Sequence, residues 1–152
     1  KMEEDILRRI GTIARALDSI ANVEFKEIEL NRGQYLYLTR IKENPGIIAN
    51  HLAELLSVDR TTTARAIQKL EKNSLIEKKN DQKNRKIKHL FVTDKGEKLA
   101  QKIEQENAYS NELALTGLDS VQRAELTALL QIVEKNVSAN WYFVKNGGKR
   151  EY

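Results

Sequence analysis

Helical periodicity runs along most of this 152-residue chain and is interrupted in one place by two strand-like segments. The chain has one proline and seven glycines, so few residues stop a helix. Between Glu3 and Ala21, apolar residues recur at steps of three and four, which predicts an amphipathic helix. We therefore expect a mainly α fold with one small β-hairpin.

The remaining helices are placed by apolar spacing and by residues that cap helix ends. Asp59 is a strong N-cap, because its carboxylate can accept backbone N–H groups of the next turn. The other caps are expected at Asn31, at Thr93 or Asp94, and at Asp119 or Ser120. The expected helices cover 32–43, 47–56, 60–73, 95–116 and 120–141, and Asn73 is expected to end the third in left-handed geometry. The strands are expected at 75–79 and 86–93.

Positive charge is concentrated in the expected hairpin. The whole chain has 26 Lys and Arg against 22 Asp and Glu, a net charge of +4. Residues 77–88 hold six basic and two acidic residues, which gives the same net charge within this short segment. Nucleic acid is the natural partner of such a patch, and a solvated surface hairpin is the alternative.

The expected helices over 47–56 and 60–73 are joined by a tight turn and together form a helix-turn-helix. The second helix of this motif can enter the major groove of DNA, where hydroxyl, arginine and glutamine side chains recognise phosphates and base edges. The predicted contacts from it are Arg60, Thr61, Thr62, Thr63, Arg65, Gln68 and Lys69.

The basic hairpin that follows can act as a wing. We expect Arg85 to enter the adjacent minor groove while Lys83 and Lys86 contact phosphates. Asp81 stands four residues before Arg85 and is expected to orient it through an ion pair, the alternative being an ordinary surface pair.

Five segments together resemble the MarR family of winged helix-turn-helix transcription regulators. They are LNRGQY (30–35), LAELLSVDRTTTAR (52–65), LEKNSLIE (70–77), DQKNR (81–85) and LFVTDKG (90–96). Arg85 matches the arginine at the family's wing tip, and Asp81 its orienting aspartate. Three residues depart from the pattern: Ser57 replaces a usual glycine, Gln82 a common proline and Asn84 a common acid.

The resemblance implies one MarR-like domain over residues 1–152. Residues 30–96 would form the winged helix-turn-helix lobe, and 1–29 with 97–145 the long dimerisation helices. The implied function is a homodimeric transcription regulator, a repressor that binds a palindromic operator in double-stranded DNA. Many family members release DNA when a small aromatic or phenolic effector binds between the dimerisation helices and the winged lobe. The segments that would line that cleft carry Ile13, Leu17 and Tyr35, for which a core role is the alternative.

Several classes of protein are disfavoured by what the sequence lacks. There is no cysteine, and His51 and His89 are isolated, so we expect no metal site, no cofactor and no enzyme activity. No apolar run approaches the roughly 20 residues of a membrane span, and residues 1–10 do not resemble a signal peptide, so a cytoplasmic protein without a membrane partner is expected. A winged helix that binds RNA or another protein remains the alternative function.

Overall fold

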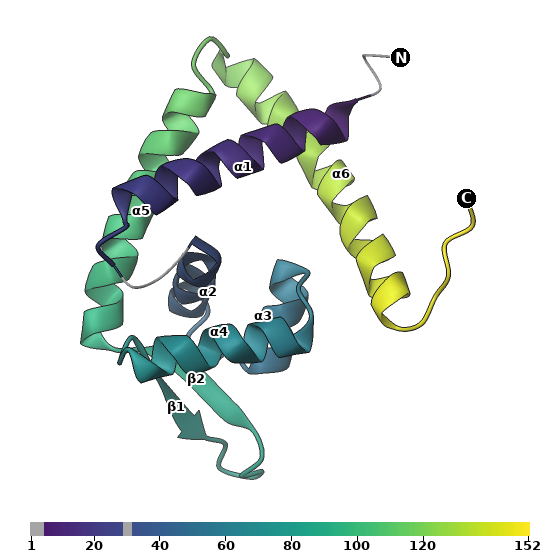
Figure 1. The fold of residues 1–152 in the computed structure, drawn as a ribbon. Coiled ribbons are helices and arrows are strands. Elements are labelled where there is room, and N and C mark those ends of the chain that lie inside the picture. Colours follow the sequence, from purple (N-terminus) through teal and green to yellow (C-terminus); the bar gives the residue numbers. More distant parts are fainter. Residues whose placement is uncertain (1–4, 29–31) are drawn as a thin grey trace.

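The chain folds into a helical base and a winged lobe (Figure 1). The computed structural model describes residues 5–28 and 32–152. The base consists of α1 (Ile6–Glu24), α5 (Asp94–Ala114) and α6 (Ser120–Lys145). The lobe consists of α2 (Arg32–Glu43), α3 (Ala49–Leu56), α4 (Arg60–Lys72), β1 (Ile76–Asn80) and β2 (Lys88–Val92). The expected fold class, mainly α with a small hairpin, is confirmed, whereas the expected cap at Asn31 lies outside the described residues.

The lobe is built around one apolar core to which each of its helices and both strands contribute. Leu38, Ile41, Leu52, Leu70 and Leu90 are almost completely shielded from solvent. Burying a leucine or isoleucine side chain stabilises a fold by about 1.5–3 kcal/mol, so this cluster holds α4 and the hairpin in a fixed relation.

The hairpin is antiparallel, and its register runs from Ile76 opposite Val92 to Asn80 opposite Lys88. Ile47 extends this small sheet by forming a bridge with Leu90, whose N–H donates to the Ile47 carbonyl at 2.9 Å. Because Ile47 has an extended partner, α3 begins at Ala49, and the expectation that its helix begins at Ile47 is wrong.

The residues that begin the helices are largely those expected. The Asp59 carboxylate accepts a hydrogen bond from the Thr62 N–H at 3.0 Å, and Thr93 Oγ1 accepts one from the Gly96 N–H at 3.0 Å. Asp119 forms a capping box with Gln122 at the start of α6. Asn73, however, does not end α4 in left-handed geometry: its φ is −86°, and the left-handed residue is Ser74, with a φ of 60°.

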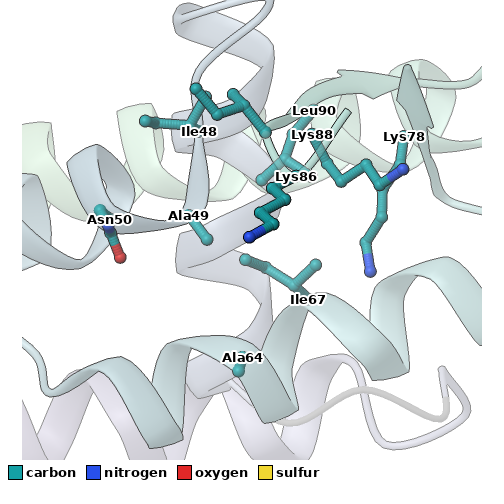
Figure 2. Close-up of a pocket in the computed structure, with 10 residues that line it drawn as sticks. Ile48, Ala49, Asn50, Ala64, Ile67, Lys78, Lys86, Lys88 and Leu90 are labelled. Carbon is teal, nitrogen blue, oxygen red and sulfur yellow. The ribbon is translucent and has the colours of Figure 1, made fainter. Parts of the chain in front are cut away.

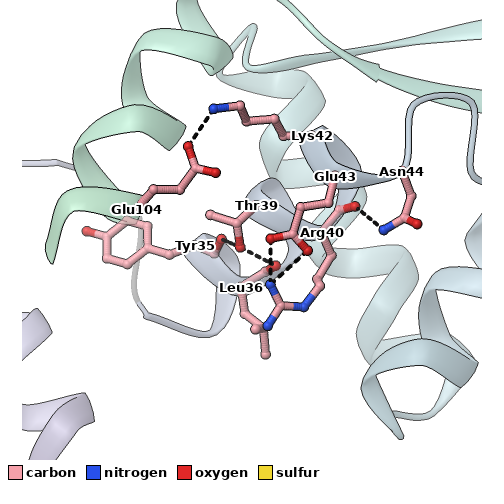
Figure 3. Close-up of polar contacts among 8 residues, drawn as sticks. All are labelled: Tyr35, Leu36, Thr39, Arg40, Lys42, Glu43, Asn44 and Glu104. Carbon is pink, nitrogen blue, oxygen red and sulfur yellow. Dashed lines mark hydrogen bonds and ion pairs between the residues drawn. The ribbon is translucent and has the colours of Figure 1, made fainter. Parts of the chain in front are cut away.

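Polar links through α2 join the base to the lobe. Lys42 of α2 forms ion pairs with Glu97 and Glu104 of α5, and Figure 3 shows Lys42 reaching toward Glu104. At the end of α1, the Phe25 carbonyl accepts a hydrogen bond from the Tyr35 hydroxyl at 3.2 Å. The N-terminal half of α5 and the C-terminal end of α1 are therefore fixed to α2.

The outer part of the base has little cover within one chain. None of the residues of α6 is buried, and apolar side chains of α1 and α6 are largely exposed to solvent. In the part of the chain that the structure describes, no helix has the length and apolar character needed to cross a membrane.

Candidate nucleic-acid interface

One side of α4 presents a row of polar and cationic side chains to solvent. Its members are Arg60, Thr61, Thr62, Arg65, Gln68 and Lys69. They are held outward because Ala66, Ile67 and Leu70 of the same helix are buried in the lobe core. Six of the seven residues predicted on this helix therefore lie where a groove of DNA could reach them.

Thr63 is the exception, and its prediction as a DNA contact is wrong. Its side chain is 1% exposed, and its Oγ1 donates a hydrogen bond to the Asp59 carbonyl at 2.9 Å. Thr63 lies on the same side of α4 as Ile67 and Leu70, because residues four and seven apart share a helix face. The residue stabilises the first turn of α4 and does not reach the surface.

Asp59 fixes the start of the same helix. Its Oδ2 accepts from the Thr62 N–H, and its Oδ1 accepts from the Thr62 hydroxyl at 2.6 Å. The Thr62 hydroxyl and backbone N–H hold the pKa of Asp59 below its usual value. The carboxylate is therefore ionised at neutral pH, and Thr62 is held in one orientation at the exposed end of α4.

In the wing, Asp81 does not form the ion pair with Arg85 that its spacing suggests. Its Oδ2 accepts from the backbone N–H groups of Lys83 and Asn84, each at 3.0 Å, and its Oδ1 lies 2.9 Å from Nε2 of His89. The His89 ring first, and the two N–H groups next, lower the pKa of this carboxyl. Asp81 thus orders the backbone of the turn that carries Arg85. Its predicted role in orienting the wing for DNA stays a proposal.

The cations predicted for the wing are exposed. Lys83, Arg85 and Lys86 all belong to the turn before β2. Within residues 32–152, the wing lysines that form ion pairs with acids are Lys78, with Glu71 at 3.3 Å, and Lys79, with Glu77 at 3.7 Å. The three predicted cations are left to meet an external anion.

A shallow pocket separates α4 from the wing. Figure 2 shows Ala64 and Ile67 on α4 facing Lys86 and Ile48 across it. Lys78 and Lys88 also line this pocket, so an apolar floor lies beside ammonium groups. Across the described residues, no three His, Asp or Glu side chains group together as metal ligands would.

Two polar contacts near this interface were not found by the sequence reasoning. His89 bridges Asp81 to the Gly46 carbonyl, and Ser57 donates a hydrogen bond to the Ser138 hydroxyl of α6 at 3.0 Å. The second contact joins the turn of the helix-turn-helix to the base. The one sign of this contact in the sequence is Ser57, at a position where glycine is usual. No local pattern pairs residues as far apart in the sequence as Ser57 and Ser138.

The residues predicted to line an effector cleft do not lie in one environment. Tyr35 is buried, its hydroxyl donates to Phe25, and its ring stacks edge-on against the Phe25 ring at 5.2 Å between centroids. Leu17 is half-buried, and Ile13 lies in a hollow along α1. Tyr35 is therefore a core residue here, and an effector role for these three side chains stays a prediction.

Known proteins resemble this chain over nearly its whole length. The MarR family model matches residues 30–88. The HTH-type transcriptional regulator YybA of Bacillus subtilis is 55% identical, and the match covers 97% of this chain and 99% of that protein.

Solved structures give the same result. A SlyA-like transcription regulator from Listeria monocytogenes is 53% identical and superimposes with a TM-score of 0.91, covering 97% of this chain and 99% of that one. A MarR family transcriptional regulator from the same organism, crystallised in complex with a 26mer DNA, is 53% identical with a TM-score of 0.93 and the same coverage of both chains. A chain with this lobe, wing and helical base, and with these relatives, belongs to the MarR family of winged-helix transcription regulators.

Proposed function

We propose that this regulator binds a palindromic operator in double-stranded DNA as a homodimer and that it represses transcription. The observation that carries the proposal is the exposed row on α4 beside the unpaired wing cations Lys83, Arg85 and Lys86. A helix of this width fits the major groove, and the cations of a wing suit the phosphates and the narrow minor groove that flank it.

The homodimer is supported by the apolar side chains that the base leaves exposed. Ile6, Ile13 and Ile20 on α1, and Leu129, Leu130 and Val137 on α6, are each more than 40% exposed in the single chain. Exposed apolar patches of this extent mark interaction surfaces. If the helical bases of two protomers associate around a two-fold axis, their two winged lobes lie on one face of the dimer. The centres of the two DNA half-sites would then be about 10 base pairs apart.

The DNA complex of the Listeria monocytogenes relative supports DNA as the partner. The proposal is tested by titrating labelled duplexes with the protein at several salt concentrations. We expect a selected palindrome to bind far more tightly than a random duplex, and log affinity to fall steeply with log salt. Equal affinity for all duplexes, or stronger binding to structured RNA, would support the alternative function as an RNA-binding or protein-interaction module.

Arg85 is the wing residue whose loss should be most visible. We expect Arg85→Ala to weaken operator binding and to reduce the salt slope by about 1, because a positive charge in the minor groove, which displaces counterions from the DNA, is lost. Gln82→Ala is the matched control, since Gln82 is an exposed, uncharged residue of the same turn. Equal affinities of both variants and the wild type would remove Arg85 from the contact surface.

Release by a small aromatic or phenolic effector is the finest part of the proposal. It rests on the half-buried Leu17 and exposed Ile13, which leave apolar surface on the side of α1. A panel of benzoates and phenols added to the preformed operator complex tests it. Failure of every compound to lower operator affinity would argue that DNA binding here is not controlled by this class of ligand.

A further inference from the structure

His89 lies at the joint between the wing and the rest of the lobe. It belongs to β2, and its ring is flanked by two oxygen atoms from different segments. Nδ1 lies 2.7 Å from the Gly46 carbonyl oxygen in the loop between α2 and α3, and Nε2 lies 2.9 Å from Oδ1 of Asp81 in the wing. The ring is therefore the bridge from the wing turn to that loop.

The two oxygen atoms decide which form of the ring fits. A carbonyl oxygen and an ionised carboxylate only accept hydrogen bonds, so each needs an N–H from the imidazole. A neutral imidazole has one N–H and can satisfy one of them, whereas the imidazolium has two and satisfies both. The geometry thus fits the charged form, with both N–H groups used inside the protein and none left for a phosphate.

The bridge continues into the tip of the wing through Asp81. While Oδ1 faces His89, Oδ2 accepts from the N–H groups of Lys83 and Asn84. The carboxylate therefore couples the position of the His89 ring to the backbone of the turn that presents Lys83 and Arg85. Loss of the proton from His89 would leave either the Gly46 carbonyl oxygen or Oδ1 of Asp81 without the N–H donor that the ring supplies.

We propose that His89, as its imidazolium, is the positioning residue that fixes the wing for DNA, so that operator affinity falls as the pH rises through the titration of His89. This inference rests on the DNA binding proposed above. The expected loss is about threefold to tenfold in affinity, because one partly exposed, charge-assisted hydrogen bond is removed.

The surrounding charges agree with this direction. Asp81 is the charged group that contacts the ring, and Lys79 is its cross-strand neighbour on β1, with its ammonium over the Phe91 ring at 4.8 Å from the centroid. The hydrogen bond to Asp81 first, and that to Gly46 next, raise the pKa of His89 above its ordinary value. The stabilising bridge is complete below the ordinary histidine pKa of about 6.5 and is lost as the pH rises through the raised pKa.

The test compares operator affinity between about pH 5.5 and pH 9 at fixed ionic strength. The wild type should lose affinity over the range in which His89 titrates, and His89→Gln should not show this loss. His51→Gln, which removes the other histidine, should keep it. A pH profile of His89→Gln that matches the wild type would overturn the inference. A salt slope that stays constant with pH separates positioning from a direct phosphate contact.

The free protein supplies a second measurement that does not depend on DNA. Imidazole proton resonances, assigned by comparison with His51→Gln, give the titration midpoint of His89. The backbone amide resonances of Lys83 and Asn84 should shift with that same midpoint, and Asp81→Asn should move it to lower pH. Amide resonances that ignore the His89 titration would overturn the inference, whereas absence of operator binding at every pH would count against the proposed function instead.

Discussion

At the scale of single residues, Gly96 shows how closely α5 approaches the lobe. A Cβ atom at this position would lie 2.0 Å from the backbone carbonyl oxygen of Leu75. That oxygen also accepts a hydrogen bond from the Thr93 N–H at 3.0 Å, so it cannot move aside without disturbing the start of α5. Glycine is therefore required here by a close backbone approach, and its φ plays no part.

We expect Gly96→Ala to lower the free energy of unfolding by about 1–3 kcal/mol, because overpacking against backbone forces the elements apart. Gly11→Ala is the control, since Gly11 is also helical and its new Cβ would meet only the flexible side chain of Arg15 at 3.1 Å. Alanine there should be neutral or stabilising. Urea unfolding of both variants at one protein concentration measures the difference, and equal midpoints would contradict the packing argument.

The lowered pKa of Asp59 gives a pH dependence with a definite sign. A carboxyl group whose pKa is depressed in the folded state stabilises the fold above its unfolded pKa, and this stabilisation is lost as the pH falls through the folded value. We expect Asp59→Ala to lower the thermal midpoint at pH 7 and to lower it less below about pH 4.

Asp59→Asn is the matched variant for this test, because asparagine also caps a helix but does not titrate. Its thermal midpoint relative to Asp59→Ala should change little with pH. A difference between wild type and Asp59→Ala that is as large in acid as at neutral pH would show that the carboxylate charge does not contribute.

How far residues could be predicted depends on which physical rule applies to them. The cap at Asp59 was predictable because it is a local interaction within three residues. The burial of Thr63 is also encoded in the sequence, because its spacing from Ile67 and Leu70 places it on the buried face of the helix even though its hydroxyl suits a DNA contact. The Asp81–Arg85 ion pair was wrong because a spacing of four brings side chains together on a helix, whereas these residues lie in a turn.

At the scale of elements, the turn between α3 and α4 is joined to α6 through one strained residue. Ser57 has a φ of 53°, in the left-handed region where a side chain is disfavoured, and its hydroxyl donates to Ser138. Glycine would relieve the backbone but could not form this bond. The serine thus keeps a contact that ties the helix-turn-helix to the base.

We expect Ser138→Ala to lower the free energy of unfolding by about 1 kcal/mol, because the Ser57 hydroxyl loses its partner while the strain remains. Ser57→Gly loses the same bond but gains about as much from the relieved backbone, so its stability should be near that of the wild type. Both variants should weaken operator binding if the bond holds the lobe in place. Urea unfolding and duplex titration check the two effects separately, and wild-type operator affinity in both variants would exclude a positioning role.

The elements themselves were largely predictable because most of them depend on local periodicity. Within residues 5–28 and 32–152, the six helices and both strands lie close to the expected places, and α6 extends beyond the expected end at Trp141 to Lys145. The start of α3 was missed because Ile47 pairs with Leu90, which is far away in the sequence. The end of α4 lies within one residue of its expected place, but the left-handed geometry expected at Asn73 occurs at Ser74.

At the scale of the whole molecule, the base has an apolar surface that a single chain does not cover. Leu129 and Val137 of α6 are 61% and 54% exposed, and no residue of that helix is buried. Such side chains contribute to stability only when a second surface covers them. The proposed homodimer supplies that surface and also explains why one chain carries a single winged lobe.

We expect the double variant Leu129→Lys/Val137→Lys to be monomeric, because two buried cations at a paired interface would lack partners. Leu55→Lys on α3 is the control, since Leu55 is 52% exposed but lies outside the base. Light scattering after gel filtration measures the mass of each. Operator affinity of the monomer should fall by about two to four orders of magnitude, because the second lobe no longer binds at the high effective concentration that the dimer provides. A double variant that keeps the mass and the operator affinity of the wild type would show that α6 is not the dimer surface, and a monomeric wild type would refute the homodimer itself.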